Sequence, residues 1–292
     1  MSGTGNRIEG EKKKSKYGDI WHRMKKNKAA MVSLYVIIFI ILVAIFADVI
    51  APYQYDQQDS SSPYAEPSRE HLLGTDNLGR DVLSRLIYGA RQSLQLGIIA
   101  TAVASVVGIF IGAIAGYYGG WPDNLIMRGL DIYQSIPMFL LCITLAAVMG
   151  ASLRNAILAI GISMIPAPAR MMRASILSVR EMEYIEAAQA INVGTPRIIR
   201  KHIIPNSIAP LIVFITMSIG MNILAGAGLS YIGLGAQPPL PEWGALISDA
   251  RKVMRDHGTL ALYPGLCIMI TVLAFNLLGD GLRDALDPRL KN

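Results

Sequence analysis

Residues able to carry out chemistry are few in this sequence and stand far apart. No histidine has a partner at metal-ligand spacing, no nucleophile stands beside a base within an apolar run, and no G-x-x-x-x-G-K-[ST] phosphate loop is present. Both cysteines lie inside apolar runs, which indicates packing rather than a disulfide framework. We therefore expect no catalytic residue, metal, cofactor or bound ATP. The residues considered are His22, His71, His202, His257, Cys142 and Cys267.

The most informative spacing lies in the segment 170–206. The stretch 175–191 is helix-prone, and within it an acid, Glu186, is followed by the small residues Ala187 and Ala188. A helix face of small residues bracketed by charge suits insertion into a groove on a partner. A simple basic loop retained in the cytoplasm is the alternative.

A turn and a second helix follow this stretch. Asn192 and Gly194 both tolerate positive φ, so either can end the first helix. The second helix is predicted from Pro196 to about His202, ending before Pro205. The segment 170–206 therefore reads as helix, turn, helix.

The elements that position this segment are membrane spans. The chain is 52% hydrophobic and 16% charged, whereas a soluble domain carries about 25% charged residues. Six apolar stretches are long enough to cross a bilayer as helices. We predict an all-α, polytopic membrane protein, with Pro137 disturbing the third span and Pro166 and Pro168 bending the fourth. The spans lie near 29–50, 92–118, 129–150, 153–170, 206–235 and 258–281.

Lysine and arginine set the expected orientation. With the N-terminus inside, 19 of the 27 basic residues fall in cytoplasmic segments. Both termini are therefore expected in the cytoplasm, and the net charge of +6 indicates retained loops rather than nucleic-acid binding. We expect a cytoplasmic tail 1–28, an uncleaved first span 29–50, an extracytoplasmic segment 51–91, a five-helix transmembrane domain 92–282 and a tail 283–292.

The extracytoplasmic segment divides into two parts. Residues 53–67 are rich in Ser, Gln and Pro and are expected to be irregular. Residues 76–94 place apolar side chains on one helical face, with Arg80, Arg85 and Arg91 largely elsewhere. An amphipathic helix on the outer membrane surface is predicted there, and a solvated loop leading into the second span is the alternative.

Small residues recur in two spans. In the second span, Gly108, Gly112 and Gly116 continue a four-residue repeat of small side chains, which indicates close helix packing, with pathway lining as the alternative. In the fifth span, Gly226, Gly228 and Ser230 stand in a glycine-rich outer end that is expected to bend or pack tightly.

Six apolar runs contain no Asp, Glu, Lys, Arg or His, namely residues 29–47, 92–122, 132–153, 155–169, 203–241 and 258–279. Ion- and proton-coupled carriers place such groups at membrane depth, where they bind the driving ion. A secondary transporter, the main alternative of another class, is therefore disfavoured. An intramembrane enzyme lacks its nucleophile, and a scaffold subunit without a pathway remains open. The energy source is expected on another chain.

The segment 170–206 also carries a family resemblance. Glu186-Ala187-Ala188, followed by a turn and by His202-Ile203-Ile204-Pro205-Asn206, resembles the EAA motif of ABC importer permeases. The family usually has Gly six residues after the glutamate, whereas Asn192 stands here. The resemblance implies that this is a cytoplasmic coupling loop that docks into a cleft on the ATPase, and that Glu186 holds the loop in place through a backbone or basic partner. The residues of the coupling loop are Glu186, Ala187, Ala188, Asn192, Gly194, His202 and Pro205.

Three further stretches resemble the dipeptide, oligopeptide and nickel branch of that family, in its C-type subunits. They are His71–Asp81 with Ser84-Arg85, Gln237–Gly244, and Asn276–Asp284 with Asp287-Pro288-Arg289. Within the first, the outer-surface motif comprises Gly74, Thr75, Asp76, Gly79, Arg80 and Asp81.

The resemblance implies an assembly in a bacterial inner membrane. This chain would pair with a second, different permease, two cytoplasmic ATPases and an extracytoplasmic solute-binding protein. Di- or oligopeptides are the expected cargo, and nickel chelates or glutathione are alternatives within the branch.

Overall fold

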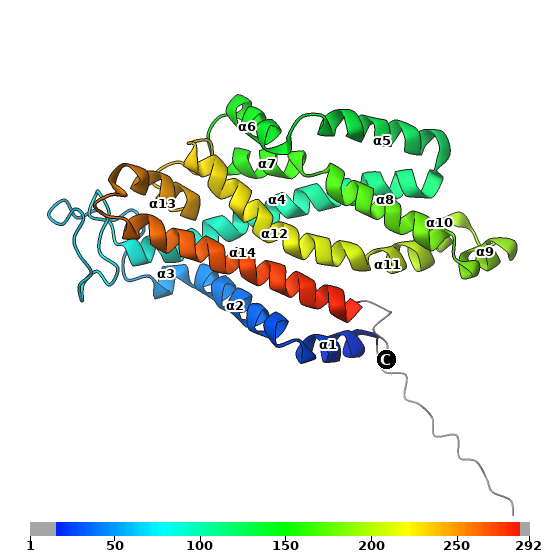
Figure 1. The fold of residues 1–292 in the computed structure, drawn as a ribbon, viewed down its shortest axis with the longest axis horizontal. Coiled ribbons are helices and arrows are strands. Elements are labelled where there is room, and N and C mark those ends of the chain that lie inside the picture. Colours follow the sequence, from blue (N-terminus) through cyan, green and yellow to red (C-terminus); the bar gives the residue numbers. More distant parts are fainter. Residues whose placement is uncertain (1–15, 287–292) are drawn as a thin grey trace, which may run out of the picture.

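The computed structural model describes residues 16–286, and in that part the chain is helical with a single isolated bridge, between Thr75 and Asp81 (Figure 1). The all-α prediction is confirmed. The expected tails, 1–28 and 283–292, lie partly outside the described residues. The helices are α1 Lys16–Lys26, α2 Lys28–Ile45, α3 Ala47–Ile50, α4 Val82–Tyr118, α5 Gly120–Gln134, α6 Met138–Met149, α7 Leu153–Ser163, α8 Pro166–Arg180, α9 Glu183–Ala190, α10 Thr195–Ile198, α11 Ile204–Ser207, α12 Ala209–Tyr231, α13 Trp243–Ala250 and α14 Thr259–Leu286.

Five helices of the described chain are long and apolar enough to cross a bilayer, namely α2, α4, α7 with α8, α12 and α14. The pair α5 and α6 is bent by 79° at its break, and it brings the number of candidate passages to six when it is counted as one span. The bend falls just before α6, where Pro137 cannot continue the helix because it lacks an N–H donor. The predicted disturbance at Pro137 is therefore confirmed.

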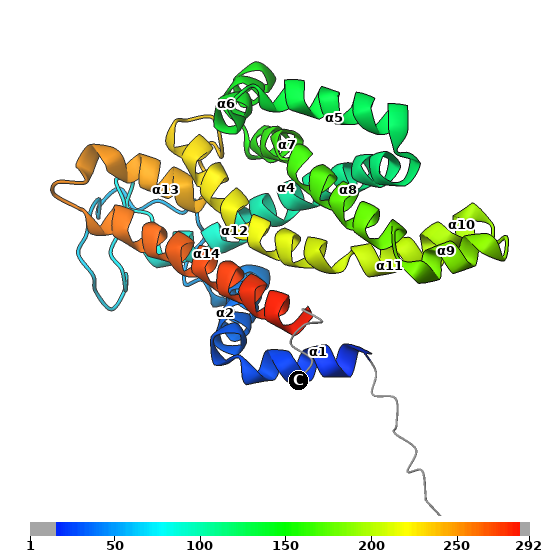
Figure 2. The same cartoon turned by 45° about the vertical axis from the view of Figure 1, so that its right-hand side comes forward.

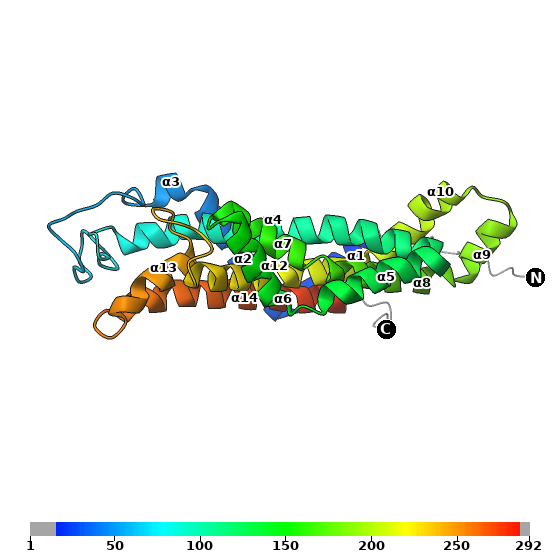
Figure 3. The same ribbon diagram turned by 90° about the horizontal axis from the view of Figure 1, so that it is seen from above.

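The passages form an elongated bundle. The loop 51–81 and α13 lie at one end, and α9 and α10 project from the other (Figures 1 and 3). Helix α4 runs through the middle and packs against α2, α7, α8 and α12, while α14 packs against α2 and α12. Helices α5 and α6 lie along one margin, beside α7 and α8 (Figure 2).

The closest packing in the bundle joins α4 to α8. A Cβ atom at Gly112 would overlap the Ala169 carbonyl, and one at Gly108 would lie 2.6 Å from Pro168 Cγ. At Gly116 the nearest atoms are 3.0 Å away, on Arg173 and Ile176. The repeat of small residues therefore serves helix contact, as such repeats do where lipid gives no hydrophobic drive.

Helix boundaries differ from the predictions in the outer segment. The predicted separate surface helix over 76–94 is wrong: residues 76–81 form a turn, and α4 runs unbroken from Val82. Asp81 caps α4 by accepting a hydrogen bond from the Ser84 amide at 2.8 Å, which fixes the start of the helix. Arg80 and Arg85 are buried against Asp76 rather than exposed.

The segment 170–206 also departs from its predicted bounds. Helix α8 ends at Arg180 and α9 begins at Glu183, so the single helix predicted over 175–191 is divided. The break lets Ile185 join the apolar cluster of Ile176 and Val179.

The second helix does not end before Pro205. A π-helical turn over Ile199–Ile203 leads straight into α11. The wider turn accommodates a proline that offers no N–H and whose ring would otherwise collide with the preceding turn.

Candidate functional site

The outer-surface motif is organised around Asp76. Its Oδ1 accepts hydrogen bonds from the amides of Leu78 and Arg80 at 2.9 and 3.0 Å. Its Oδ2 lies 2.7 Å from Arg80 Nε and 3.4 Å from Arg85 Nε. Arg85 is 3% exposed and also reaches Asp249 of α13, at 3.6 Å. The motif thus ties the outer loop to α4 and α13.

The other motif residues shape the same turn. Gly74 and Gly79 have φ of +77° and +70°, a region that side chains disfavour. Thr75 donates a hydrogen bond to the Ser62 carbonyl and accepts one from the Ala65 amide. Asp81 caps α4 through Oδ2, while its Oδ1 lies 2.9 Å from His71 Nδ1. All six residues therefore hold the loop against the bundle.

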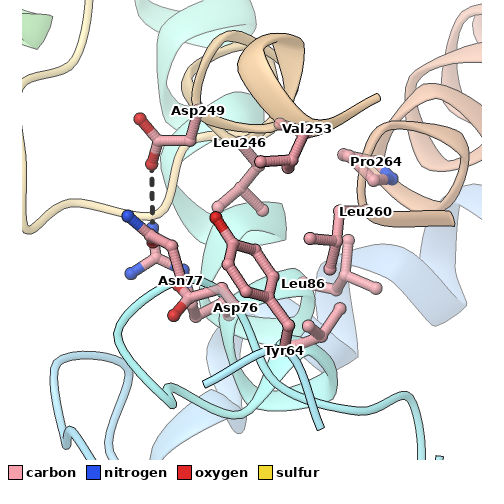
Figure 4. A pocket seen from close by; sticks show the side chains of 12 residues that line it. Tyr64, Asp76, Asn77, Leu86, Leu246, Asp249, Val253, Leu260 and Pro264 are labelled. Atoms are coloured by element: carbon pink, nitrogen blue, oxygen red, sulfur yellow. Dashed lines mark ion pairs between the residues drawn. The ribbon is translucent and has the colours of Figure 1, made fainter. Parts of the chain in front are cut away.

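A small cavity of about 40 Å³ lies beneath this network (Figure 4). Tyr64 and Asp76 line it from the loop, and Asp249 and Pro264 line it from α13 and α14. The Tyr64 ring stacks on His257 with centroids 4.5 Å apart, so the loop also contacts the segment that leads into α14. Burial raises the pKa of the Asp249 carboxyl, and the nearby Arg85 opposes that shift.

A buried carboxylate that the sequence analysis missed joins α13 to α4. Glu242 is fully buried and caps α13, accepting hydrogen bonds from the amides of Gly244 and Ala245 at 2.9 and 3.0 Å. It accepts a third from Ser93 Oγ of α4, at 3.0 Å. Trp243 Nε1 donates to the Leu86 carbonyl. The signal in the sequence was an acid directly before a short apolar helix, an ordinary N-cap pattern.

The projecting end of the bundle has a small core of its own. Ile185 of α9 and Ile198 of α10 are buried with Met172 and Ile176 of α8 and with Leu211 of α12. Helices α9 and α10 are therefore anchored to two membrane passages by apolar packing.

The turn between α9 and α10 lies at Asn192. Asn192 has φ +58°, the left-handed conformation that ends a helix, whereas Gly194 is outside that region. Of the two positions left open by the sequence, the structure selects Asn192. At the far end, Pro205 lies in the first turn of α11, and the His202 carbonyl accepts a hydrogen bond from Asn206 Nδ2 at 2.8 Å.

The face of α9 that carries Glu186 and Ala187 points away from the helix bundle. Glu186 and Ala187 are exposed, Ala188 is half-buried, and Ile191 is 77% exposed. Among residues 16–286 the Glu186 side chain makes no hydrogen bond or ion pair. This acid is therefore available to another chain rather than holding the loop internally.

Each of the three small residues singled out in α12 makes a different contact. A Cβ atom at Gly226 would overlap the Leu96 side chain of α4, and one at Gly228 would lie 3.5 Å from the Phe139 ring of α6. Ser230 is buried and its Oγ accepts a hydrogen bond from the Ala236 amide at 3.2 Å. None of the three faces an open channel within the described chain.

Two ion pairs join α8 to α5. Arg173 pairs with Asp123, whose side chain is largely buried, and Arg170 pairs with Asp131 at 2.7 Å. Neither pair was predicted from the sequence, because the third and fourth spans were placed near 129–150 and 153–170. The structure extends α5 back to Gly120 and α8 on to Arg180, so Asp123 lies in the first turn of α5 and both arginines lie within α8.

Comparison with protein families gives two matches that together span most of the chain. The family of binding-protein-dependent transport system inner membrane components matches residues 108–292. The N-terminal transmembrane domain of oligopeptide transport permease C matches residues 15–67.

Individual relatives cover nearly the whole chain. The dipeptide transport system permease protein DppC of Alkalihalophilus pseudofirmus is 46% identical over 278 residues, which is 95% of this chain and 91% of that protein. The glutathione transport system permease protein GsiD of Pectobacterium atrosepticum is 42% identical over 275 residues, 94% of this chain and 91% of that protein. A chain of the inward-facing MetNI methionine ABC transporter has a similar fold, with a TM-score of 0.58 at 19% identity, over 70% of this chain and 97% of that one.

Proposed function

Because the chain belongs to the family of binding-protein-dependent transport system inner membrane components, we propose that it lines, with a second permease, the pathway of an ATP-driven importer for di- or oligopeptides. The chain is a multi-pass membrane transport component of the ABC type. Similarity to a dipeptide permease over 95% of the chain is the observation that carries the choice of cargo.

The partners follow from the projecting end. Helix α9 exposes Glu186, Ala187 and Ile191 on a base that is packed into α8 and α12. Such a face supports docking of a cytoplasmic ATPase, and the anchored base supports transfer of its motion to the membrane passages as a rigid body. The chain itself does no chemistry, and two ATPase subunits supply hydrolysis.

The opposite end suits the extracytoplasmic binding protein. The loop 51–81 is fastened to α4 and α13 by Asp76, Arg85 and Asp249, so it offers a fixed surface rather than a mobile one. This assignment places both termini in the cytoplasm of a bacterial cell with the chain in its inner membrane.

Reconstitution tests the proposal directly. The chain is placed in proteoliposomes with its second permease, two ATPases and binding protein, and uptake of a labelled dipeptide is measured with and without ATP. We expect uptake only with ATP and all partners. Uptake by this chain alone, driven by a proton gradient, would contradict the proposal.

The same vesicles test the role of Glu186. Glu186→Lys should lower ATPase association and uncouple hydrolysis from uptake, while the chain still inserts in the membrane. Glu66→Lys, which changes an exposed acid at the other end of the molecule, is the matched control for ATPase association and membrane insertion. Normal uptake by the Glu186 variant would contradict the docking role.

Glutathione is the second candidate cargo, favoured by the 42% identity to a glutathione permease. Competition separates the candidates: unlabelled dipeptide, glutathione and a nickel chelate are each added to the labelled dipeptide assay. We expect the dipeptide to compete best. Stronger competition by glutathione or by nickel would reassign the cargo within the family.

A further inference from the structure

Four buried polar side chains gather between α4 and α12 in the middle of the bundle. Thr101 and Ser105 lie on α4, and Ser218 and Asn222 lie on α12. Asn222 Nδ2 donates a hydrogen bond to Thr101 Oγ1 at 2.8 Å, which joins the two helices directly. The Thr101 hydroxyl in turn donates to the Gly97 carbonyl of its own helix, at 2.7 Å.

Two atoms of this cluster have no hydrogen-bond partner within residues 16–286. They are Ser105 Oγ and Asn222 Oδ1, on side chains of residues that are 4% and 1% exposed. Thr101 and Ser218 each donate to the carbonyl four residues earlier, the usual bond of a hydroxyl inside a helix, and Ser105 does not. Buried polar groups without a partner are rare in folded proteins, because each one costs the free energy of its desolvation.

The cluster lies within the hydrocarbon layer. Residues 92–118 of α4 contain no Asp, Glu, Lys, Arg or His, and Ser105 is at the middle of this run. Thr101 precedes it by about 6 Å along the helix axis. The hydrocarbon core of a bilayer is about 30 Å thick, so both residues lie well inside it and away from bulk water.

Ser105 and Asn222 both line a small cavity. Its volume is about 10 Å³, which is close to the smallest space that holds one water molecule. Thr101 and Ser218 line it as well, so all four residues of the cluster border the same space. Pro168, at the start of α8, closes the remaining side together with apolar neighbours.

The cavity lies where α4 changes its packing partner. A Cβ atom at Gly97 would lie 2.5 Å from Ile223 Cγ1 of α12, whereas one at Gly108 would lie 2.6 Å from Pro168 Cγ of α8. Ser105 is between these two close contacts along α4, so the gap between α4, α8 and α12 follows from the way the three helices diverge.

We propose that this cavity binds one water molecule, which links Ser105 of α4 to Asn222 of α12. The Ser105 hydroxyl donates to the water oxygen, and the water donates one hydrogen to Asn222 Oδ1. The second water hydrogen goes to the hydroxyl oxygen of Ser218, which can accept it because the Ser218 hydrogen is already donated to the Phe214 carbonyl. The water then makes three hydrogen bonds, the usual number for a buried water, and both unpartnered atoms are satisfied.

The water link has a role that apolar packing cannot fill at this depth. Within lipid, an apolar side chain gains little from leaving acyl chains for another helix, so polar contacts contribute much of the preference for one partner. A direct hydrogen bond and a water-mediated one side by side therefore fix the position of α12 along α4.

A structure of the complete importer tests the site directly. The importer is imaged by electron cryo-microscopy in lipid nanodiscs, at a resolution that shows ordered water. We expect density for one water within about 2.5–3.0 Å of both Ser105 Oγ and Asn222 Oδ1. A Ser105 hydroxyl turned back to the Thr101 carbonyl, with no density in the cavity, would overturn the proposal.

The direction of a stability change tests the same site in solution. A hydroxyl that bonds a buried water stabilises the fold, whereas a buried hydroxyl without a partner destabilises it. Ser105→Ala should therefore lower the thermal unfolding midpoint of the detergent-solubilised chain by about 2–4 °C. An unchanged or higher midpoint would overturn the proposal, because the hydroxyl would then have no partner to lose.

Two further variants separate the hydrogen bond from packing. Ser105→Cys keeps an atom at the γ position, but a thiol is a weak donor, so it should lower the midpoint as Ser105→Ala does. Ser33→Ala removes a buried hydroxyl that donates to the Ala29 carbonyl of its own helix, and it should leave the midpoint almost unchanged. A wild-type midpoint for Ser105→Cys would assign the loss to packing and overturn the water link. A fall for Ser33→Ala as large as that for Ser105→Ala would also overturn it, since any buried hydroxyl would then have the same effect.

Discussion

At the scale of single residues, the conformation of Asn192 makes a sharp prediction. With φ at +58°, this position accepts Gly or Asn, whereas a β-branched side chain there strains the backbone by about 1–3 kcal/mol. Asn192→Gly should therefore be nearly silent, and Asn192→Val should misplace α9 and lower both ATPase association and ATP-driven uptake.

Gly194 provides the matched control for that experiment. It has an ordinary backbone conformation and no atom within 4 Å of a Cβ built on it, so Gly194→Ala should retain association and uptake. The opposite result, with the Asn192 variants normal and Gly194→Ala defective, would move the turn to Gly194.

Glu242 carries the second residue-scale prediction. Glu242→Ala leaves two amides of α13 and the Ser93 hydroxyl without their acceptor in a buried site. It should therefore lower the free energy of unfolding by about 2–3 kcal/mol. Thermal unfolding of the detergent-solubilised chain measures the loss as a lower midpoint. Glu66→Ala, which removes an exposed acid of the outer loop, should leave the midpoint unchanged. Equal midpoints for the two variants would deny Glu242 its capping role.

These two residues differ in how far the sequence could predict them. Asn192 stands between two helix-prone stretches, so local chain chemistry limited the turn to Asn192 or Gly194, and the backbone conformation of the folded chain decided between them. Glu242 becomes important because Ser93, far away in the sequence, lies beside it. The same is true of Arg85 and Asp249, since the contact between their helices arises only when the bundle assembles.

At the scale of elements, the contact between α4 and α8 leaves no room for a side chain larger than that of glycine at Gly112. A methyl group added at Gly112 meets the backbone carbonyl of Ala169, which cannot move without shifting α8. Gly112→Ala should therefore lower stability by about 1–3 kcal/mol. Gly129→Ala on α5, where the added Cβ has no neighbour within 4 Å, is the control. The thermal unfolding midpoints of the two variants are compared in detergent. Equal midpoints for Gly112→Ala and Gly129→Ala would contradict the close packing of α4 on α8.

The sequence was sufficient to predict the elements whose positions depend on local residue chemistry. It was not sufficient where contacts between distant parts of the chain set the end of a helix. The six apolar runs and the break at Pro137 follow from composition and from proline. The ends of the helices do not: α4 starts at Val82 because Asp81 caps it, and α8 continues to Arg180 along α4. Because those ends were placed at the limits of the apolar runs, the ion pairs between α5 and α8 were not predicted.

At the scale of the whole molecule, the two ends of the bundle have different characters. One end carries the ion-paired loop 51–81 with α13, and the other carries α9 with its exposed acid and alanine face (Figure 3). The two ends can therefore be told apart, and the distribution of Lys and Arg predicts that the α9 end faces the cytoplasm.

Labelling in intact cells tests that orientation. Ser61, in the outer loop, and Ser178, on α8 near its inner end, are both exposed serines at opposite ends of the molecule. In the Cys142→Ala and Cys267→Ala background, Ser61→Cys should react with a membrane-impermeant thiol reagent added outside. Ser178→Cys should react only after the cells are opened, because the bilayer bars the reagent from the cytoplasmic side. Both positions are serines with exposed side chains. A difference in labelling between the two cysteine variants therefore reports the side of the membrane on which each one lies. Labelling of Ser178→Cys in intact cells, with Ser61→Cys protected, would invert the molecule and with it the assignment of α9 to the ATPase.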